Sequence, residues 1–403
     1  MIDFVRCGVE EQGGSPSRVF TYESGDDEAQ NLIRLAGRYI AEILSLALLL
    51  GPTISIAVPL AAQRPGPDGT FYISTYTDQI RVLDERTFEV VDLIETQHGM
   101  PGRFVVSQNR ERLYVSDATG EHIEVIDLAE GRSTDSFTLS KGNEQFRFRS
   151  FDVDPQETYV LIVGKTTTKL PDRFEVGSSV IVRYDLRNQE VMDTIPWPDG
   201  HARQSGNFMF SPDGKLVYFS AEDMIVLDSE TFTEVDRWEI SRELEPGLGR
   251  IRPGFSASYY EEPGFFTGLV RITDPINNRR MMGVARVNLA EKDMEFYTLG
   301  PSQPVGQFAL APGGGKAWGL YSEIGHYEFW AFDLRNRQVS TRREFAGRPR
   351  MGLLASTDGE LLYIHVAGNT IDVYDSDTYD LLRTVDVGGD MRGFVLLPGS
   401  DGP

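Results

Sequence analysis

A pattern of short apolar runs and turn residues recurs along most of this chain. In its clearest copy, Phe208-Met-Phe-Ser-Pro-Asp-Gly-Lys-Leu-Val-Tyr-Phe-Ser220 is followed by Met224-Ile-Val-Leu-Asp-Ser-Glu-Thr-Phe-Thr-Glu-Val235 and by Trp238. Alternating apolar residues separated by Pro-Asp-Gly and Asp-x-x-Thr turns predict four short antiparallel strands. Because a fixed-period repeat determines the whole architecture, this pattern constrains the fold more than any single motif.

An aspartate at the end of the third predicted strand marks each copy of the repeat. Aligning the chain with itself places it at Asp84, Asp127, Asp185, Asp228, Asp333 and Asp375, with Asn288 in the remaining copy. The intervals of 42 to 60 residues between these positions bracket the ~40 to 50 residues of a four-stranded blade, with two blades lengthened by loops. We therefore predict an all-β fold, a seven-bladed β-propeller spanning residues 66–398.

The first strand of each copy repeats as well, and the termini predict how the ring is completed. One large apolar residue per blade is expected to face the neighbouring blade and fill the core; these residues are Phe104, Phe151, Phe208, Phe255, Phe308, Leu353 and Phe394. The first copy, from Phe71 to Ile94, lacks an opening strand, whereas the segment from Gly393 to Pro398 is an opening strand without a blade. Pairing the two predicts N-to-C-terminal strand closure of one blade, which removes two exposed sheet edges.

The segments Ser211-Pro-Asp-Gly-Lys-Leu-Val-Tyr218 and Val226-Leu-Asp-Ser-Glu-Thr231 resemble the repeats of YVTN-type bacterial propellers. This family is related in architecture to WD40-like repeat proteins and to the heavy chain of methylamine dehydrogenase. The resemblance covers residues 66–398 and implies an exported or periplasmic protein with a binding or scaffold role. The Trp-Asp dipeptide of true WD repeats is missing, which weakens the analogy with eukaryotic scaffolds. Because the shared residues form turns, the resemblance indicates the fold and says little about the function.

The first sixty residues are not part of the repeat. Residues 1–38 are largely polar and are predicted to be disordered or to lie upstream of the real start. Within residues 39–62, the apolar stretch Ile43–Leu50 follows Arg34 and Arg38 and precedes small residues at Ala61 and Ala62, the layout of a signal peptide. The segment is also long enough for a membrane anchor, and an amphipathic helix that packs on the propeller is the remaining alternative. We expect a periplasmic or extracellular protein, cleaved or anchored.

Charge and cysteine content narrow the set of partners. With 39 Lys and Arg against 61 Asp and Glu, the formal net charge is -22, so the long-range field repels phosphate backbones and argues against nucleic-acid binding. Cys7 is the single cysteine, which excludes an intramolecular disulfide and a Cys-x-x-Cys zinc or haem site. We predict a monomeric propeller that engages a protein partner or a small anionic ligand.

Arginines recur just ahead of the opening strands. They are Arg103, Arg149, Arg252, Arg350 and Arg392, and Asn207 and Gln307 hold the matching places in two other copies. A ring of guanidinium groups around the axis of an acidic propeller would form an electropositive well for a carboxylate or phosphate group. Pairing of these arginines with acidic loop residues such as Glu95 or Asp390 is the equally open alternative, which would make the ring structural.

Long loops predict which face of the propeller binds. Residues 165–177, 196–206, 241–253 and 273–280 are expected to form loops on the face opposite the Pro-Asp-Gly turns. His201 lies in one of these loops and joins the candidate ligand-binding residues. The histidines have no metal-ligand spacing, and the chain has no catalytic motif, so we predict no catalytic residue, metal or cofactor.

The leading hypothesis is therefore a non-catalytic ligand- or protein-binding scaffold acting through its loop face and arginine-rimmed channel. The alternative is an enzyme or an enzyme subunit. It would be either a lactonase-like hydrolase at the channel mouth or the heavy chain of a quinoprotein amine dehydrogenase whose cofactor is carried by a second polypeptide. The hydrolase version requires a histidine or carboxylate within reach of the arginine ring.

Overall fold

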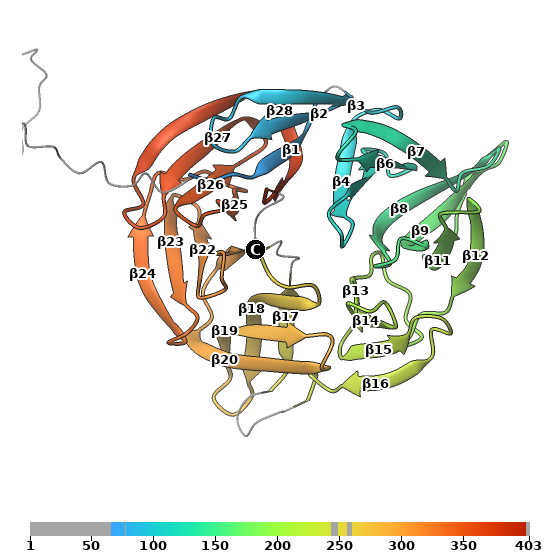
Figure 1. The fold of residues 1–403 in the computed structure, drawn as a ribbon. Coiled ribbons are helices and arrows are strands. Elements are labelled where there is room, and N and C mark those ends of the chain that lie inside the picture. The colour runs from blue at the N-terminus through green and yellow to red at the C-terminus, as the bar shows by residue number, and fades with distance from the viewer. Residues whose placement is uncertain (1–65, 77, 243–248, 256–259, 400–403) are drawn as a thin grey trace, which may run out of the picture. The chain divides into compact units, whose positions relative to one another are not determined.

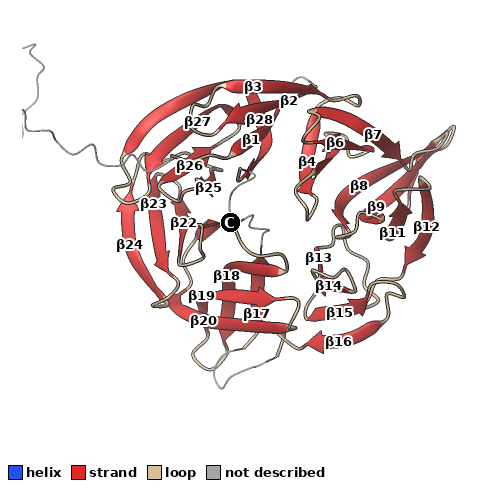
Figure 2. Cartoon of the chain, viewed as in Figure 1, coloured by secondary structure: helices blue, strands red, loops and turns tan. Residues whose placement is uncertain are grey.

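The computed structural model describes residues 66–76, 78–242, 249–255 and 260–399. The predicted N-terminal extension (1–38) and the signal or anchor segment (39–62) lie outside these residues. The described part of the chain is built from strands and turns (Figure 2), and it contains no helix long and apolar enough to cross a bilayer.

The strands form seven antiparallel blades around one axis, six of four strands and one of five, with β7, β12, β16, β20 and β24 at the rim (Figure 1). The first three blades contain β1 (Thr70–Thr75), β2 (Gln79–Asp84), β3 (Val90–Glu95), β4 (Pro101–Val106), β5 (Arg112–Asp117), β6 (His122–Asp127), β7 (Arg132–Thr138), β8 (Glu144–Val153), β9 (Tyr159–Lys169), β10 (Phe174–Val176), β11 (Val180–Asp185) and β12 (Glu190–Ile195). The next two contain β13 (Phe208–Phe210), β14 (Leu216–Ser220), β15 (Met224–Asp228), β16 (Glu234–Trp238), β17 (Ile251–Phe255), β18 (Phe265–Asp274), β19 (Arg279–Asn288) and β20 (Asp293–Pro301). The last two contain β21 (Val305–Leu310), β22 (Lys316–Glu323), β23 (His326–Asp333), β24 (Gln338–Glu344), β25 (Gly352–Ala355), β26 (Leu361–His365), β27 (Gly368–Asp375) and β28 (Leu381–Leu397).

The repeated aspartate ends the third strand of its blade, as the sequence predicts. Asp228 at the end of β15 shows why: its Oδ1 accepts the backbone N–H of Glu230 at 3.1 Å and of Thr231 at 2.8 Å. These bonds hold the tight turn into the fourth strand. The same place is taken by Asp84, Asp127, Asp185, Asn288, Asp333 and Asp375.

The final strand, β28, belongs to two blades. Its first half pairs with β27, where Ile371 lies opposite Val385. Its second half pairs with β1, where Phe71 lies opposite Leu396 and Ile73 opposite Phe394. The C-terminal segment therefore lies beside β1 in the predicted position, and the first blade consists of the end of β28 followed by β1, β2 and β3.

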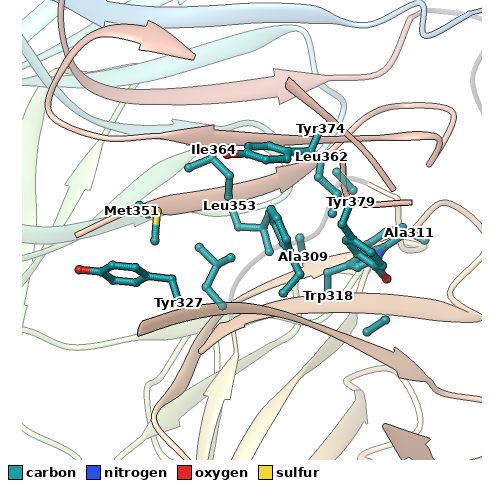
Figure 3. Packing of buried hydrophobic residues seen from close by; sticks show 14 of the residues in the cluster. Ala309, Ala311, Trp318, Tyr327, Met351, Leu353, Leu362, Ile364, Tyr374 and Tyr379 are labelled. Carbon is teal, nitrogen blue, oxygen red and sulfur yellow. The ribbon is translucent and has the colours of Figure 1, made fainter. Parts of the chain in front are cut away.

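Hydrophobic packing between neighbouring blades supplies the core. Figure 3 shows one such layer, in which Trp318 and Tyr327 face Leu353, Leu362 and Tyr374 of the next blade. Equivalent clusters join every successive pair of blades, including the last and the first. Burial of these large side chains accounts for a rigid ring that does not need disulfides.

A tyrosine in the second strand adds a polar link between some blades. Tyr114 donates its hydroxyl to Glu157 at 2.7 Å, and Tyr363 donates to Glu85 at 2.8 Å, in each case across to the next blade. Tyr218 donates to the carbonyl of Leu289 in the same way. Each bond satisfies a hydroxyl that burial would otherwise leave without a partner.

Two of the predicted long loops are wrong. Residues 165–177 form a hairpin in which β9 continues to Lys169 and pairs with β10, with Thr167 opposite Val176. Threonine is β-branched and suits a strand, so the run of threonines extends β9 rather than ending it. Residues 273–280 likewise contain the ends of β18 and β19, and the intervening turn is held by Asp274, which accepts the N–H of Asn277 at 3.0 Å.

Of the other two predicted loops, one contains no strand and the other is described only in part. Residues 196–206 contain no strand, as expected, because β12 ends at Ile195 and β13 begins at Phe208. Residues 243–248 of the predicted loop 241–253 lie outside the described residues, and β17 begins at Ile251.

Candidate functional site in the axial cavities

The inner strands enclose two adjoining cavities of about 500 and 570 Å³ that share Arg103, Phe104 and Gly254. The first is bounded mainly by β4, β8 and β13 and by the segment ahead of β18. The second is bounded by β21, β25 and the C-terminal half of β28. Both volumes are of the size that holds a small organic molecule.

The repeated aromatic residues of the first strands form much of the cavity walls. Phe104, Phe151 and Phe208 line the first cavity, and Phe308, Leu353 and Phe394 line the second. They also pack against the clusters between blades, as predicted. The same column therefore serves the core and gives the cavities an apolar lining, which the sequence alone did not indicate.

Four of the seven residues in the predicted arginine column lie at β-bulges. In β4 the pairing shifts between Pro101 and Phe104, which makes Arg103 a bulge residue. Similar shifts place Arg149 in β8, Gln307 in β21 and Arg392 in β28 at bulges. A bulge leaves a residue out of the regular pairing and re-aims its side chain, which is why bulges recur next to binding sites.

The column divides into two tiers. Arg103, Asn207 and Gln307 directly precede the aromatic residue of their blade, and these three line the cavities. Arg149, Arg252, Arg350 and Arg392 stand two or three residues before the repeated first-strand residue and do not line either cavity, although all seven side chains are exposed. The structure therefore brings three of the seven predicted residues to the cavities.

The alternative in which the ring is neutralised by acidic loop residues has no support in the described part of the chain. There, none of the five arginines forms an ion pair. Arg103 donates its backbone N–H to the Ser116 hydroxyl at 3.1 Å, and its guanidinium lies 5.9 Å from the ring centre of Phe151. Its positive charge is thus not matched by a direct carboxylate contact.

Asp152 is a carboxylate in the same cavity as Arg103. It follows Phe151 in β8, and its Oδ1 accepts the N–H of Val153 at 3.0 Å. Burial raises its pKa to about 7, against smaller lowering effects of that hydrogen bond and of the Arg103 charge. The carboxylate that the hydrolase alternative requires near the arginines is therefore present.

Sequence reasoning missed Asp152, although a signal was available. The residue that follows the repeated first-strand residue is apolar in five other blades, namely Val105, Met209, Ala309, Leu354 and Val395, and is Ser256 in the sixth. A charged residue at this position breaks the repeat. Departures from an otherwise regular pattern mark functional or strained positions.

The segment ahead of β18 reaches across the propeller. Tyr260 donates its hydroxyl to the carbonyl of Ala355 in the last blade at 3.1 Å, and it lines the second cavity. Glu261, next in sequence, is buried, lines the first cavity and accepts a bond from Arg286 at 3.1 Å. Burial raises the pKa of Glu261, an effect that Thr267 and Arg286 partly offset. This segment therefore forms part of the wall of both cavities.

The histidines occupy different environments. His201 is exposed in the loop ahead of β13 and does not line either cavity; its carbonyl accepts a bond from Arg203 at 2.9 Å. His365 lines the second cavity with its ring 3.9 Å from that of Phe394, and burial lowers its pKa to about 4. The rings of His98 and His122 stack with their centres 4.1 Å apart.

Among the described residues, no three histidine, cysteine or acidic side chains come together as a metal site.

Comparison with solved structures identifies the β-propeller fold. A functionally unknown protein from Desulfotomaculum acetoxidans matches with a TM-score of 0.51 at 11% identity, over 82% of this chain and 99% of that chain. The dihydro-heme d1 dehydrogenase NirN, in complex with DHE, matches with a TM-score of 0.50 at 13% identity, over 81% of this chain and 74% of that one. Apo AztD from Citrobacter koseri gives a TM-score of 0.49 at 12% identity, over 83% and 99% of the two chains. At these identities the first two likenesses show the fold alone.

No protein-family model matches the chain, and no curated protein matches it by sequence.

Proposed function

We propose that this chain is an exported binding propeller of the YVTN type, whose axial cavity receives a small organic anion with an apolar body. The observation that carries the proposal is Arg103. This arginine lies at a bulge, lines a cavity of about 500 Å³ and has no ion-pair partner among the described residues. A guanidinium group in such a place is suited to hold a carboxylate through two parallel hydrogen bonds.

The lining of the cavity supports an anion that also carries an apolar body. Phe104, Phe151 and Phe208 surround the region of Arg103, and aromatic walls favour hydrophobic groups through burial of their surface. Asn207 lines the first cavity and Gln307 the second, and both can add hydrogen bonds to a polar head group. A fully hydrated inorganic anion would make no hydrophobic contact with these aromatic side chains.

The outer arginines have a different role in this proposal. Arg149, Arg252, Arg350 and Arg392 are exposed and line neither cavity, on a chain with a formal net charge of -22. A local cluster of positive charge on an otherwise acidic surface raises the local concentration of an anion and its rate of association. These four arginines would therefore guide the ligand to the cavity mouth without contacting it once bound.

Export follows from the order of basic flank, apolar stretch and small residues within residues 34–62. Fractionation of cells that express the full chain, followed by mass spectrometry of the mature N-terminus, tests this part. Recovery of the intact N-terminus from the cytosol alone would contradict it.

The binding proposal is tested with the full-length chain by isothermal titration calorimetry, with 3-phenylpropionate as the carboxylate probe. We expect Arg103→Gln to weaken binding at least tenfold, because one charge-assisted contact is lost, with little change in thermal stability. The matched control is Arg187→Gln, which removes the same charge from an exposed turn arginine and should bind as the parent does. Equal affinities in both variants, or no binding at millimolar probe, would contradict the proposal.

The same cavity also allows a direct test of the hydrolase alternative, because Asp152 supplies a carboxylate beside Arg103. Lactones with aromatic side chains are incubated with the protein, and acid release is followed in a pH-stat. Turnover that disappears in Asp152→Asn would replace the binding proposal with a hydrolase. Absence of turnover together with carboxylate binding supports the binding proposal.

A further inference from the structure

The first cavity is lined by Asp152, Glu261 and Glu262 as well as by Arg103 and Arg110, so it contains carboxylates that the proposed anion does not use. Asp152 lies on the blade next to that of Arg103, and both side chains line the cavity. Its one hydrogen bond among the described residues comes from the N–H of the following residue, Val153. A carboxylate has room for several donors, so most of its hydrogen-bonding capacity is unused.

Arg103 and Asp152 are near each other without forming an ion pair. The arginine influences the titration of Asp152, and its guanidinium lies 5.9 Å from the ring centre of Phe151, the residue before Asp152. The two charges are therefore neighbours in one cavity, and neither neutralises the other by contact. A cavity that bound only an anion would bring its negative charge close to a half-buried carboxylate, which costs free energy.

We infer that the cavity recognises a zwitterion, an α-amino acid with an apolar side chain. Arg103 binds its carboxylate, Asp152 binds its ammonium group, and the aromatic residues Phe104 and Phe208 receive its side chain. The inference rests on the proposed function, because it takes the anion contact at Arg103 as given and adds the second contact. An ammonium group removes the repulsion and supplies the donors that Asp152 lacks.

The position of Asp152 in the repeat supports this assignment independently. Five of the other six blades have an apolar residue at the equivalent place, and the sixth has a serine. A half-buried carboxylate with one hydrogen bond is unfavourable for stability unless it is paired, and a ligand that pairs with it would account for its place in the repeat. The turn aspartates need no such explanation, because backbone N–H groups satisfy them.

The experiment compares three probes that share one apolar body. L-Phenylalanine carries both charges, 3-phenylpropionate carries only the carboxylate, and 2-phenylethylamine carries only the ammonium group. L-Leucine and L-methionine, each with its deaminated acid, extend the set to other side chains. Affinities for the full-length chain are measured by isothermal titration calorimetry at one pH and salt concentration. We expect at least one amino acid to bind about tenfold or more tightly than its deaminated acid.

Two isosteric variants assign the ammonium contact. Asp152→Asn should reduce the affinity for the amino acid to that of the deaminated acid, while the affinity for the deaminated acid stays the same or rises. The matched control is Asp92→Asn, because Asp92 makes the same bond to the N–H of the next residue, at 2.8 Å, but is exposed on β3. The control should leave all affinities unchanged.

The outcomes separate the two proposals. If each deaminated acid binds as tightly as its amino acid and Asp152→Asn changes neither, the zwitterion inference is overturned and the anion site stands. If no amino acid and no acid binds at 10 mM, both proposals are overturned. A third outcome is that amino acids bind more tightly than their deaminated acids, but Asp92→Asn lowers the affinity for the amino acid as much as Asp152→Asn does. This result overturns the assignment of the ammonium contact to Asp152.

Discussion

The aspartates of the turns and Asp152 of the axial cavity differ in how their charge is satisfied. Asp228 receives backbone N–H bonds from Glu230 and Thr231, and these bonds lower its pKa. Asp152 receives one local bond, and burial raises its pKa to about 7. The same residue type is therefore a structural acceptor on the turn face and an incompletely satisfied charge in the cavity.

Glu85 shows that burial alone does not distinguish the two cases. It is fully buried, yet it accepts bonds from the N–H of Gly69 at 2.8 Å, the N–H of Thr357 at 3.0 Å and the hydroxyl of Tyr363 at 2.8 Å. The difference lies in the number of donors that the protein itself supplies. A carboxylate with few internal donors is the better candidate for contact with a ligand.

The largest expected effect is on Glu85. Glu85→Ala leaves the donors of Gly69, Thr357 and Tyr363 without an acceptor between the last blade and the first, so we expect a loss of about 3 kcal/mol in the free energy of unfolding. Urea denaturation followed by tryptophan fluorescence measures it. Tyr363→Phe removes one hydrogen bond to Glu85 and should lower the free energy of unfolding by about 1 kcal/mol. This milder variant tests the same network if Glu85→Ala does not fold.

Glu89→Ala is the control for this network, because Glu89 is an exposed residue of the same turn. A loss as large as that of Glu85→Ala would show that the hydrogen bonds of Glu85 do not account for the effect.

A smaller effect is expected at a turn aspartate. Asp375 accepts the N–H of Asp377 at 2.9 Å and of Thr378 at 2.7 Å, so Asp375→Ala should cost about 1 kcal/mol at pH 7. These bonds lower its pKa. The stabilisation is therefore complete above the unfolded pKa of about 3.9 and is lost as the pH falls through the lower folded value.

Denaturation midpoints of the parent and of Asp375→Ala, measured from pH 7 down to pH 2.5, should converge at the acid end. Asp380→Ala alters an exposed residue of the same turn and should follow the parent throughout. A constant difference between parent and Asp375→Ala at all pH values would contradict the ionic origin of the bonds.

Asp152 should show the opposite dependence on pH. Its folded pKa of about 7 lies above the unfolded value of about 3.9, so the folded state holds a proton that the unfolded state has lost between these values. Stability then decreases as the pH rises through this window. Asp152→Asn cannot ionise, so without ligand it should be more stable than the parent at pH 8 and should approach it near pH 4.

Thermal unfolding at pH 4.5 and pH 8 measures this difference, with Asp92→Asn as the exposed control. A variant that is less stable than the parent at pH 8 would show that Asp152 has a stabilising partner.

The smallest effect on stability is expected for the outer arginines. Arg149 and Arg350 are exposed and form no ion pair among the described residues, so the double variant Arg149→Ala, Arg350→Ala should unfold within a few tenths of a kcal/mol of the parent. Its association rate with an anionic ligand, measured by stopped flow at low salt, should fall severalfold and approach that of the parent at high salt. A clear loss of stability with an unchanged rate would indicate a structural role instead.

The fold could be predicted because its turns use side chains with a specific local chemistry. Asp228 and its equivalents recur at the same turn in each blade, so they can be recognised in the sequence. The number of these copies gives the number of blades. The terminal strand pairing followed from an incomplete first copy and an unmatched last strand. The hairpin at residues 165–177 was not predicted, because Pro171 and the charged residues around it suggest a loop, whereas pairing between Thr167 and Val176 decides the structure.

The site could be predicted only in part. Arg103, Asn207 and Gln307 were identified from their place ahead of the first strands, but the sequence put them in one ring with Arg149, Arg252, Arg350 and Arg392. The bulges at Arg103, Arg149, Gln307 and Arg392 depend on pairing between strands and leave no local sequence signal. The route of the segment that contains Tyr260 and Glu261 is set by contacts with distant blades, which a single sequence does not reveal.

The strand shared by two blades also bears on how the protein is made. Ser74 and Gly393 are bonded to each other although they are separated by 319 positions in the chain. The opening sheet therefore stays incomplete until the strand around Gly393 has been synthesised. A partly made chain therefore cannot complete its ring, so the last pairing step joins segments from opposite ends of the propeller.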